Sequence, residues 1–254
     1  MGEATAGSTG RAQTGLSQRS VAAVSEVREY RQSRFQRPPG ACELLLVRHG
    51  ESAPARDDRP FPLVDGHGDP ELAPAGREQA YRVAERLEHE DISSIYVTTL
   101  QRTVQTAAPL AERLGIEPRI EPDLREVHLG EWEGGSFRRH VAEGHPIAQR
   151  MFAEQRWDVI PGAEPGDAFM ARVRGAITRI AARHPDEAVV VVSHGGVIGQ
   201  VLALATGATG FTFVGSDNAG ISHLVITADR WVVRRFNDTA HLGMAFTTAA
   251  QPPT

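Results

Sequence analysis

Two segments of the chain share one design, an apolar run followed at once by a His-Gly pair. Leu44–Val47 leads into Arg48–Gly50, and Val189–Val192 leads into Ser193–Gly195. An imidazole can attack phosphorus or carry a proton near neutral pH. The glycine that follows lets the backbone turn sharply and approach a ligand closely. This arrangement predicts a site for an oxyanion, with phosphate as the first candidate.

A third segment places another cation at the same site. Arg102 stands at the start of the helix predicted over 101–114, directly after the strand predicted over 92–97. A guanidinium presents a rigid fork of donors to paired oxygens. Arg48 and Arg102 together are therefore expected to clamp one phosphate group.

A fourth segment, Leu124–Gly134, supplies carboxylates. Glu126, Glu131 and Glu133 each have the chemistry of a proton donor or acceptor. Glu126 is the favoured candidate, and the other two stay open as its competitors. His128 is the only further histidine that the sequence puts near this segment.

The elements that must position these residues alternate along the chain after residue 40. Apolar runs predict strands over 44–47, 92–97 and 188–192, and a closing hairpin over 221–227 and 231–236. Helical spacing predicts helices over 76–89, 101–114, 167–183 and about 196–205. The alternation predicts a three-layer α/β/α sandwich with a mostly parallel central sheet and a small helical cap insert. In such a sheet, ligands bind beyond the carboxyl ends of the strands, where both His-Gly pairs fall.

The order of five motifs resembles that of the histidine phosphatase superfamily, also called the phosphoglycerate mutase-like family. The resemblance spans about 43–236, and its motifs are Arg48–Ser52, Asp69–Ala80, Gln101–Ala107, Leu124–Gly134 and Ser193–Gly196. It implies that His49 becomes a phosphohistidine and that Glu126 handles the leaving-group proton. It also implies a phosphate site without metal or other cofactor, formed by six residues: Arg48, Arg102, His194, Glu51, Ser52 and Gly195.

The chain departs from the family pattern beside the nucleophile. Many members have an Asn six residues after the nucleophilic histidine, where this chain has Ala55. Arg56 or Arg59 is a candidate for the missing donor. The loop Pro161–Pro165 also lacks the family's hydroxyl residue. These departures bear on the substrate more than on the reaction.

The E-W-E-G sequence at 131–134 resembles the phosphatase branch, so we expect a phosphomonoesterase that acts on a small phosphorylated metabolite. Two alternatives stay open: phosphoryl transfer of the mutase type, and a non-catalytic phosphate-binding regulator on the same fold. The sequence specifies neither the substrate nor the oligomeric state, and it leaves room for a homodimer.

Composition narrows the partners and the chemistry. All 27 basic residues are Arg, so Walker-type phosphate loops and Schiff-base chemistry, which need Lys, are excluded. The net charge of −5 predicts no nucleic-acid partner. No apolar run reaches membrane-spanning length, so no membrane partner is expected. The single cysteine, Cys42, is expected to be buried, and a cytoplasmic location is favoured.

We expect two regions along the chain. Residues 1–39 are poor in large apolar residues and are predicted to be a disordered extension, with a short helix over 20–35 as an alternative. Residues 40–254 are predicted to form the catalytic domain. Residues 135–165 break its alternation and are predicted to be the cap.

Overall fold

The computed structural model describes residues 28–243. Contacts divide the chain into two compact units, Met1–Phe35 and Gln36–Thr254. In the first unit, residues 28–35 form no helix or strand, so the alternative helix over 20–35 is wrong for this part. Residues 1–27 lie outside the described residues, and the prediction of disorder for them stays a prediction.

The second unit contains one six-stranded sheet in the order β5-β4-β6-β1-β7-β8. β5, β4, β6 and β1 pair in parallel, and β7 pairs antiparallel with both β1 and β8, so β7 alone points opposite to the other strands of this sheet. The prediction of a mostly parallel sheet is confirmed. The strands are β1 (Cys42–Arg48), β4 (Ile92–Val97), β5 (Arg119–Ile120), β6 (Ala188–Ser193), β7 (Ile221–Ile226) and β8 (Trp231–Asp238).

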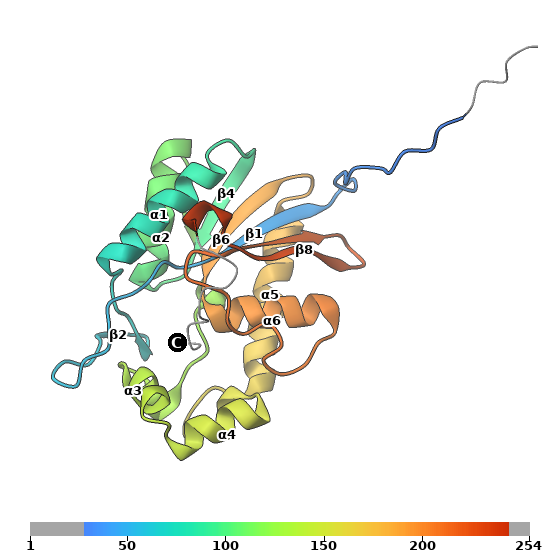
Figure 1. Cartoon of the computed structure of the whole chain (residues 1–254). Helices are drawn as coiled ribbons and strands as arrows, with labels where there is room; N and C mark the ends of the chain where they lie inside the picture. The colour runs from blue at the N-terminus through green and yellow to red at the C-terminus, as the bar shows by residue number, and fades with distance from the viewer. Residues whose placement is uncertain (1–27, 244–254) are drawn as a thin grey trace, which may run out of the picture. The chain divides into compact units, whose positions relative to one another are not determined.

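Helices cover both faces of the sheet and make the predicted three layers (Figure 1). One core packs α1 (Pro74–Leu87) and α2 (Gln101–Leu114) on the sheet. The other packs α5 (Gly166–Arg183) and α6 (Gly195–Thr206) on the opposite face. Cys42 lies in this second core, and burial raises its pKa to about 12. No helix within 28–243 is long and apolar enough to cross a membrane.

The helix boundaries follow local signals. Gly115 ends α2 with φ at 66°, a conformation that costs glycine nothing. α1 begins at Pro74, two residues before the predicted start, because proline is well tolerated in the first turn. α5 ends before His184-Pro185, as expected. The predicted helices and strands therefore agree with the observed ones to within about two residues.

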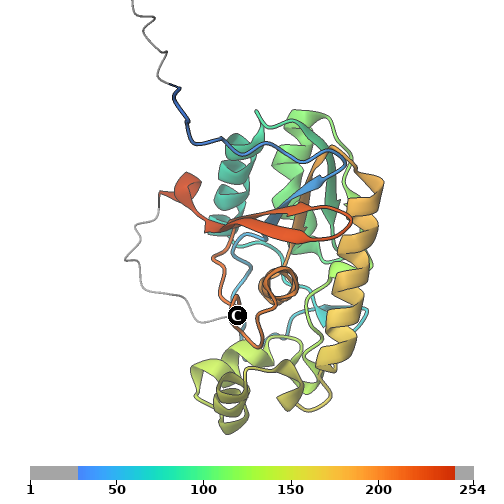
Figure 2. The ribbon, with the colours of Figure 1, turned by 90° about the vertical axis from the view of Figure 1, so that its right-hand side faces the viewer.

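A smaller cluster of elements lies beyond one edge of the sheet (Figures 1 and 2). It contains α3 (Ser136–Ala142) and α4 (Pro146–Glu154), within the interval 135–165. Its own apolar core is formed by five residues: Trp132, Phe137, Ala148, Met151 and Ile160. A two-stranded sheet, β2 (Leu63–Val64) with β3 (His67–Gly68), escaped prediction because two residues are too few for a periodic pattern. We refer to α3, α4 and their connections as the cap.

Candidate active site

The two His-Gly pairs lie side by side at the carboxyl edge of the sheet. β1 and β6 are parallel neighbours, and Arg48 pairs in register with Ser193. The rings of His49 and His194 follow these residues, and their centroids are 5.2 Å apart. Parallel pairing thus brings two motifs that are distant in the sequence to the same edge of the sheet, where ligands of such sheets bind.

His49 is held as a neutral imidazole. Its side chain is buried, and Nδ1 donates a hydrogen bond of 2.7 Å to the Gly50 carbonyl oxygen. Burial, followed by the charges of Arg102 and Arg48, holds the pKa of His49 well below its usual range. Nε2 accepts a hydrogen bond of 3.2 Å from Arg102 Nε and so carries a lone pair. This is the tautomer that a nucleophilic Nε2 requires.

The backbone around His49 is fixed by the loop between α6 and β7. Asn218 Nδ2 donates to the His49 carbonyl oxygen at 3.0 Å, and Ala219 N donates to the Arg48 carbonyl oxygen at 3.0 Å. The Arg48 guanidinium donates to the Ser216 carbonyl oxygen. Nothing in the sequence pattern pointed to this loop, which lies about 170 residues from the nucleophile.

Arg48 and Arg102 are both buried beside His49. Burial lowers the pKa of Arg102 to about 10, and burial also lowers the pKa of Arg48. A Cβ on Gly195 would lie 3.4 Å from Arg48 Nε, so the glycine gives that guanidinium room at the start of α6. Arg102 also donates to the Gly68 carbonyl oxygen at 2.9 Å, and Asp69 lies 3.8 Å from it.

His194 is fully buried, with its ring against that of His49. Its Nε2 lies 3.2 Å from Thr98 Oγ1, and its Nδ1 is buried with no hydrogen-bond partner among the described residues. A Thr98 hydroxyl that donates to Nε2 puts the ring proton on Nδ1. Burial and the Arg102 charge hold the pKa of His194 well below its usual range, so the ring is neutral.

Glu126 faces the site from the segment after β5. Its carboxylate accepts hydrogen bonds from Val127 N at 2.9 Å and Gly196 N at 3.0 Å. A Cβ on Gly196 would lie 2.5 Å from Glu126 Oε1, so only glycine allows this carboxylate to reach the start of α6. Of its two competitors, Glu131 is exposed, and the Glu133 carboxylate accepts from Leu129 N and Gly68 N.

Arg172 of α5 fixes the backbone that carries Glu126. It donates to the carbonyl oxygens of Asp123, Arg125 and Glu126 at 2.7 to 2.9 Å. Its remaining donors meet both carboxylate oxygens of Glu164 at 2.7 and 2.8 Å. Sequence reasoning did not single out either residue of this pair.

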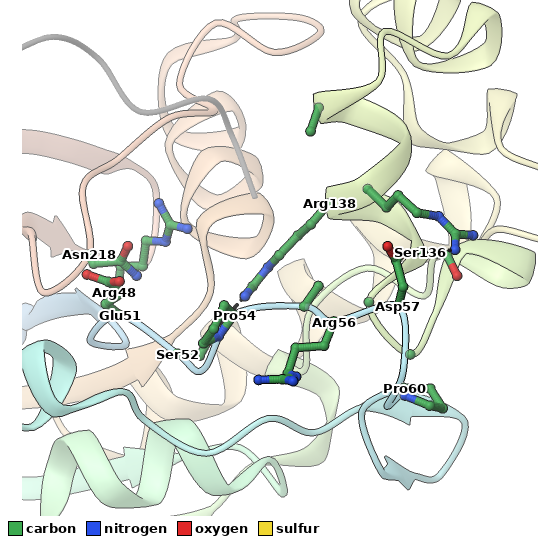
Figure 3. A pocket seen from close by; sticks show the side chains of 15 residues that line it. Arg48, Glu51, Ser52, Pro54, Arg56, Asp57, Pro60, Ser136, Arg138 and Asn218 are labelled. Carbon is green, nitrogen blue, oxygen red and sulfur yellow. Dashed lines mark hydrogen bonds and ion pairs between the residues drawn. The ribbon is translucent and has the colours of Figure 1, made fainter.

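Three cavities meet around these residues. A narrow inner cavity of about 80 Å³ is lined by His49, Arg102 and Glu126, and also by His67, which was not predicted as a site residue. A smaller one of about 50 Å³ lies against Arg48, Glu126 and Gly195. An outer cleft of about 720 Å³ holds two further predicted residues, Glu51 and Ser52 (Figure 3). Seven of the eight predicted site residues therefore line these three cavities, which share lining residues, whereas the fully buried His194 lines none of them.

The side of the outer cleft that faces the cap adds a residue that was not predicted as part of the site. Arg138 of α3 lines both the inner cavity and the outer cleft. Arg56 lines the outer cleft but pairs with Asp58 at 2.9 Å, and Arg59 is not among the lining residues. The cap sequence had shown basic residues, but not which of them turns inward. Within 28–243, no group of three or more His, Cys, Asp or Glu side chains is placed to hold a metal ion.

Comparisons with known proteins agree with this geometry. Residues 44–239 match the family model of the histidine phosphatase superfamily (branch 1). The chain is 36% identical over 206 residues to phosphoglycerate mutase-like protein 4 of Arabidopsis thaliana, covering 79% of this chain and 87% of the relative. It is 32% identical over 210 residues to phosphoserine phosphatase 1 of Hydrogenobacter thermophilus, covering 82% and 97%. A mycobacterial glucosyl-3-phosphoglycerate phosphatase in complex with VO3 superposes with a TM-score of 0.65 at 30% identity, covering 78% and 99%.

Proposed function

Because the chain belongs to the histidine phosphatase superfamily and is a phosphoric monoester hydrolase, we propose that it acts through a phosphohistidine on His49. Its substrates are small phosphorylated molecules. The observation that carries the proposal is the buried, neutral His49. Its Nδ1 is engaged by the Gly50 carbonyl, and its Nε2 lone pair lies beside Arg102.

The reaction has two steps. His49 Nε2 attacks phosphorus, a P–N bond forms, and the P–O bond to the leaving group breaks while Glu126 gives that oxygen a proton. A water then attacks the phosphohistidine, Glu126 takes its proton, and the P–N bond breaks to release inorganic phosphate. One carboxyl group thus serves as acid and then as base, which returns the site to its starting state.

The cations around His49 stabilise the group in transfer. Charge in phosphoryl transfer spreads over the non-bridging oxygens, where fixed donors act most strongly. Arg48 and Arg102 line the cavities beside His49, and the His194 ring, whose Nδ1 has no hydrogen-bond partner among the described residues, has its centroid 5.2 Å from that of His49. Ser52 and the start of α6 at Gly195 complete the proposed phosphate site, and Glu51 lies at its outer rim.

The outer cleft favours hydrolysis over mutase-type transfer. A mutase must keep water away from the phosphohistidine and hold a second phosphate. Exposed residues such as Glu51, Arg56 and Asp57 line this cleft, so water reaches the site.

The same cleft fits a substrate with a second acidic group, such as phosphoserine or glucosyl-3-phosphoglycerate, the compounds that appear in the names of two relatives. Arg139, 45% exposed and 3.5 Å from Asp57, is placed to meet that group.

Other partners and the location in the cell follow from composition alone. A net charge of −5 supports the absence of a nucleic-acid partner, and the single cysteine supports a cytoplasmic location. A homodimer is the assembly to test, by sedimentation of the full chain at several concentrations.

Phosphate release tests the function directly. We expect turnover of phosphoserine and of phosphoglycerate esters, and His49→Ala should lower kcat by about 10⁴-fold or more because the covalent route is lost. Rapid quench of the wild type in alkaline detergent with ³²P-labelled substrate should trap label on the protein that is stable to base and labile to acid. A His49→Ala variant with full turnover, or a wild type that never carries label, would exclude the phosphohistidine route.

Arg139→Ala should raise KM for acidic substrates and leave KM for p-nitrophenyl phosphate nearly unchanged.

A further inference from the structure

Arg138 reaches from the cap into the loop that follows the nucleophile. Its guanidinium donates to the Ala53 carbonyl oxygen at 2.8 Å and to Ser52 Oγ at 2.7 Å. Its guanidinium carbon lies over the Phe61 ring, 5.3 Å from the ring centroid. Figure 3 shows the side chain extending from α3 across the outer cleft toward Ser52. One residue therefore connects the cap to the catalytic loop.

The surroundings of Arg138 leave its charge without a close anion. Both of its acceptors are neutral, and in the described part of the chain no carboxylate lies within 4 Å of it. Burial, followed by the charge of Arg48, lowers the pKa of Arg138, and its own charge in turn lowers the pKa of Arg102 and His49. Three guanidinium groups thus lie around the nucleophile, where Glu126 partly offsets the charges of Arg48 and Arg102 and Glu51 partly offsets that of Arg138. Holding such a cluster costs free energy unless an anion enters.

We propose that Arg138 is a direct ligand of the phosphoryl group, a third guanidinium that the cap supplies. The inference rests on the phosphatase function proposed above. Arg138 is the one cap residue of the described chain that lines both the outer cleft and the inner cavity and also carries a fixed positive charge. A guanidinium has five N–H donors, and the bonds to Ala53 and Ser52 use two of them. The others serve the substrate.

The small residue at position 55 makes room for this arrangement. A Cβ on Gly135, just before α3, would already lie 3.2 Å from the Ala55 Cβ. A larger side chain at 55 would push this part of the cap away and withdraw Arg138. Arg138, rather than the predicted Arg56 or Arg59, is therefore the cation that supplies a donor on this side. Because Ser52 Oγ accepts from Arg138, the Ser52 hydroxyl proton stays available for a phosphate oxygen.

Binding of inorganic phosphate, measured by isothermal titration calorimetry on the full chain, tests this role without turnover. Arg138→Ala and Arg138→Gln should raise the Kd for phosphate by about tenfold or more, because each removes a charge-assisted donor. Arg138→Lys, which keeps the charge and loses the fork, should fall between. The control is Arg150→Ala, which removes one exposed cap charge paired with Glu154 on the same helix. It should stay within about twofold of the wild type.

Two outcomes separate the inference from the function on which it rests. If Arg138→Gln and Arg138→Lys bind phosphate within about twofold of the wild type and melt at its temperature, Arg138 only braces the cap and the inference is wrong. If the wild type itself binds no phosphate and releases none, the proposed function fails first. Where Arg138→Ala destabilises the fold, the Gln and Lys variants decide, because each keeps a polar side chain that can bond Ser52.

Discussion

The contact between α5 and the Glu126 segment predicts that a residue remote from phosphate controls protonation of the leaving group. Arg172 donates to the carbonyl oxygens of Asp123, Arg125 and Glu126, the last at 2.9 Å. Its Glu164 partner holds the guanidinium in that orientation. Arg172→Met keeps much of the side-chain volume and removes every one of these donors. Glu126 should then lose its fixed position without losing its carboxylate.

The cost to stability follows from the burial of the pair. The Arg172 and Glu164 side chains are 19% and 16% exposed, so their charges are mostly withdrawn from water. Removing one partner of a buried pair costs about 3 to 5 kcal/mol. The remaining exposure places Arg172→Met near the lower end, at about 3 kcal/mol. A second substitution, Glu164→Gln, removes the unpaired carboxylate and should return about 1 to 2 kcal/mol of this loss.

The cost to catalysis should depend on the leaving group. A displacement of about 1 Å in a catalytic group lowers rates by about 100-fold. The ratio kcat/KM reports the steps up to phosphoenzyme formation, where Glu126 protonates the leaving oxygen. For an alkyl ester such as phosphoserine, kcat/KM of Arg172→Met should fall by about 100-fold. For p-nitrophenyl phosphate, whose phenolate leaves unprotonated, it should fall by less than about tenfold.

The two substrates distinguish positioning from general damage to the fold. Assays run below the melting temperature of each variant, with Glu126→Gln as the reference for loss of the acid. Arg172→Met/Glu164→Gln should regain stability but keep the selective loss on the alkyl ester. Equal losses on both substrates, or a Glu126→Gln variant without leaving-group dependence, would refute the positioning role.

Two other predictions concern the histidines and a glycine. Since burial lowers the pKa of His49 and His194, kcat/KM should show no acid limb near pH 6.5 from the nucleophile, as pH–rate profiles would reveal. Below pH 6.5 the unfolded chain binds protons that the folded site refuses, so the unfolding free energy should fall by up to about 1.4 kcal/mol per pH unit for each histidine, measurable by urea titration between pH 7.5 and 5.5. A flat stability profile there would contradict the neutral assignment. Gly196→Ala should displace Glu126 and reproduce the leaving-group dependence of Arg172→Met. Gly207→Ala meets nothing within 4 Å of its Cβ but is strained by a φ of 72°, so it should lose stability without any leaving-group dependence.

Much of the fold and of the central site could be predicted because the signals are local. An apolar run, a His-Gly pair and the start of a helix each occupy fewer than fifteen residues. The rule that parallel strands end at one edge then brings the segments together. His49, His194 and Arg102 converge for this reason. The short strands β2, β3 and β5 have two residues each and leave no periodic trace.

The supporting contacts could not be predicted because they join residues with no shared pattern. Asn218 meets His49 across 169 positions, and Arg138 meets Ser52 across 86. Such contacts depend on how loops close over the sheet edge. A basic stretch in the cap indicates available charge, but only the packing of α3 against Phe61 and Ala55 decides which arginine turns inward.

The arginines of this chain, which has no lysine, can be sorted by what compensates each buried charge. Arg172 meets a carboxylate in two places and three carbonyl oxygens besides, so its charge is fully compensated within the fold. Arg138 meets only neutral oxygens, and Arg102 has its nearest carboxylate at 3.8 Å. A buried guanidinium whose charge is only partly compensated by the protein favours the binding of an anion from solution. The folded chain therefore places Arg138 and Arg102, whose charges are only partly compensated, beside His49, and the fully compensated Arg172 behind Glu126. This difference distinguishes the arginines that we expect to bind phosphate from the arginine that positions Glu126.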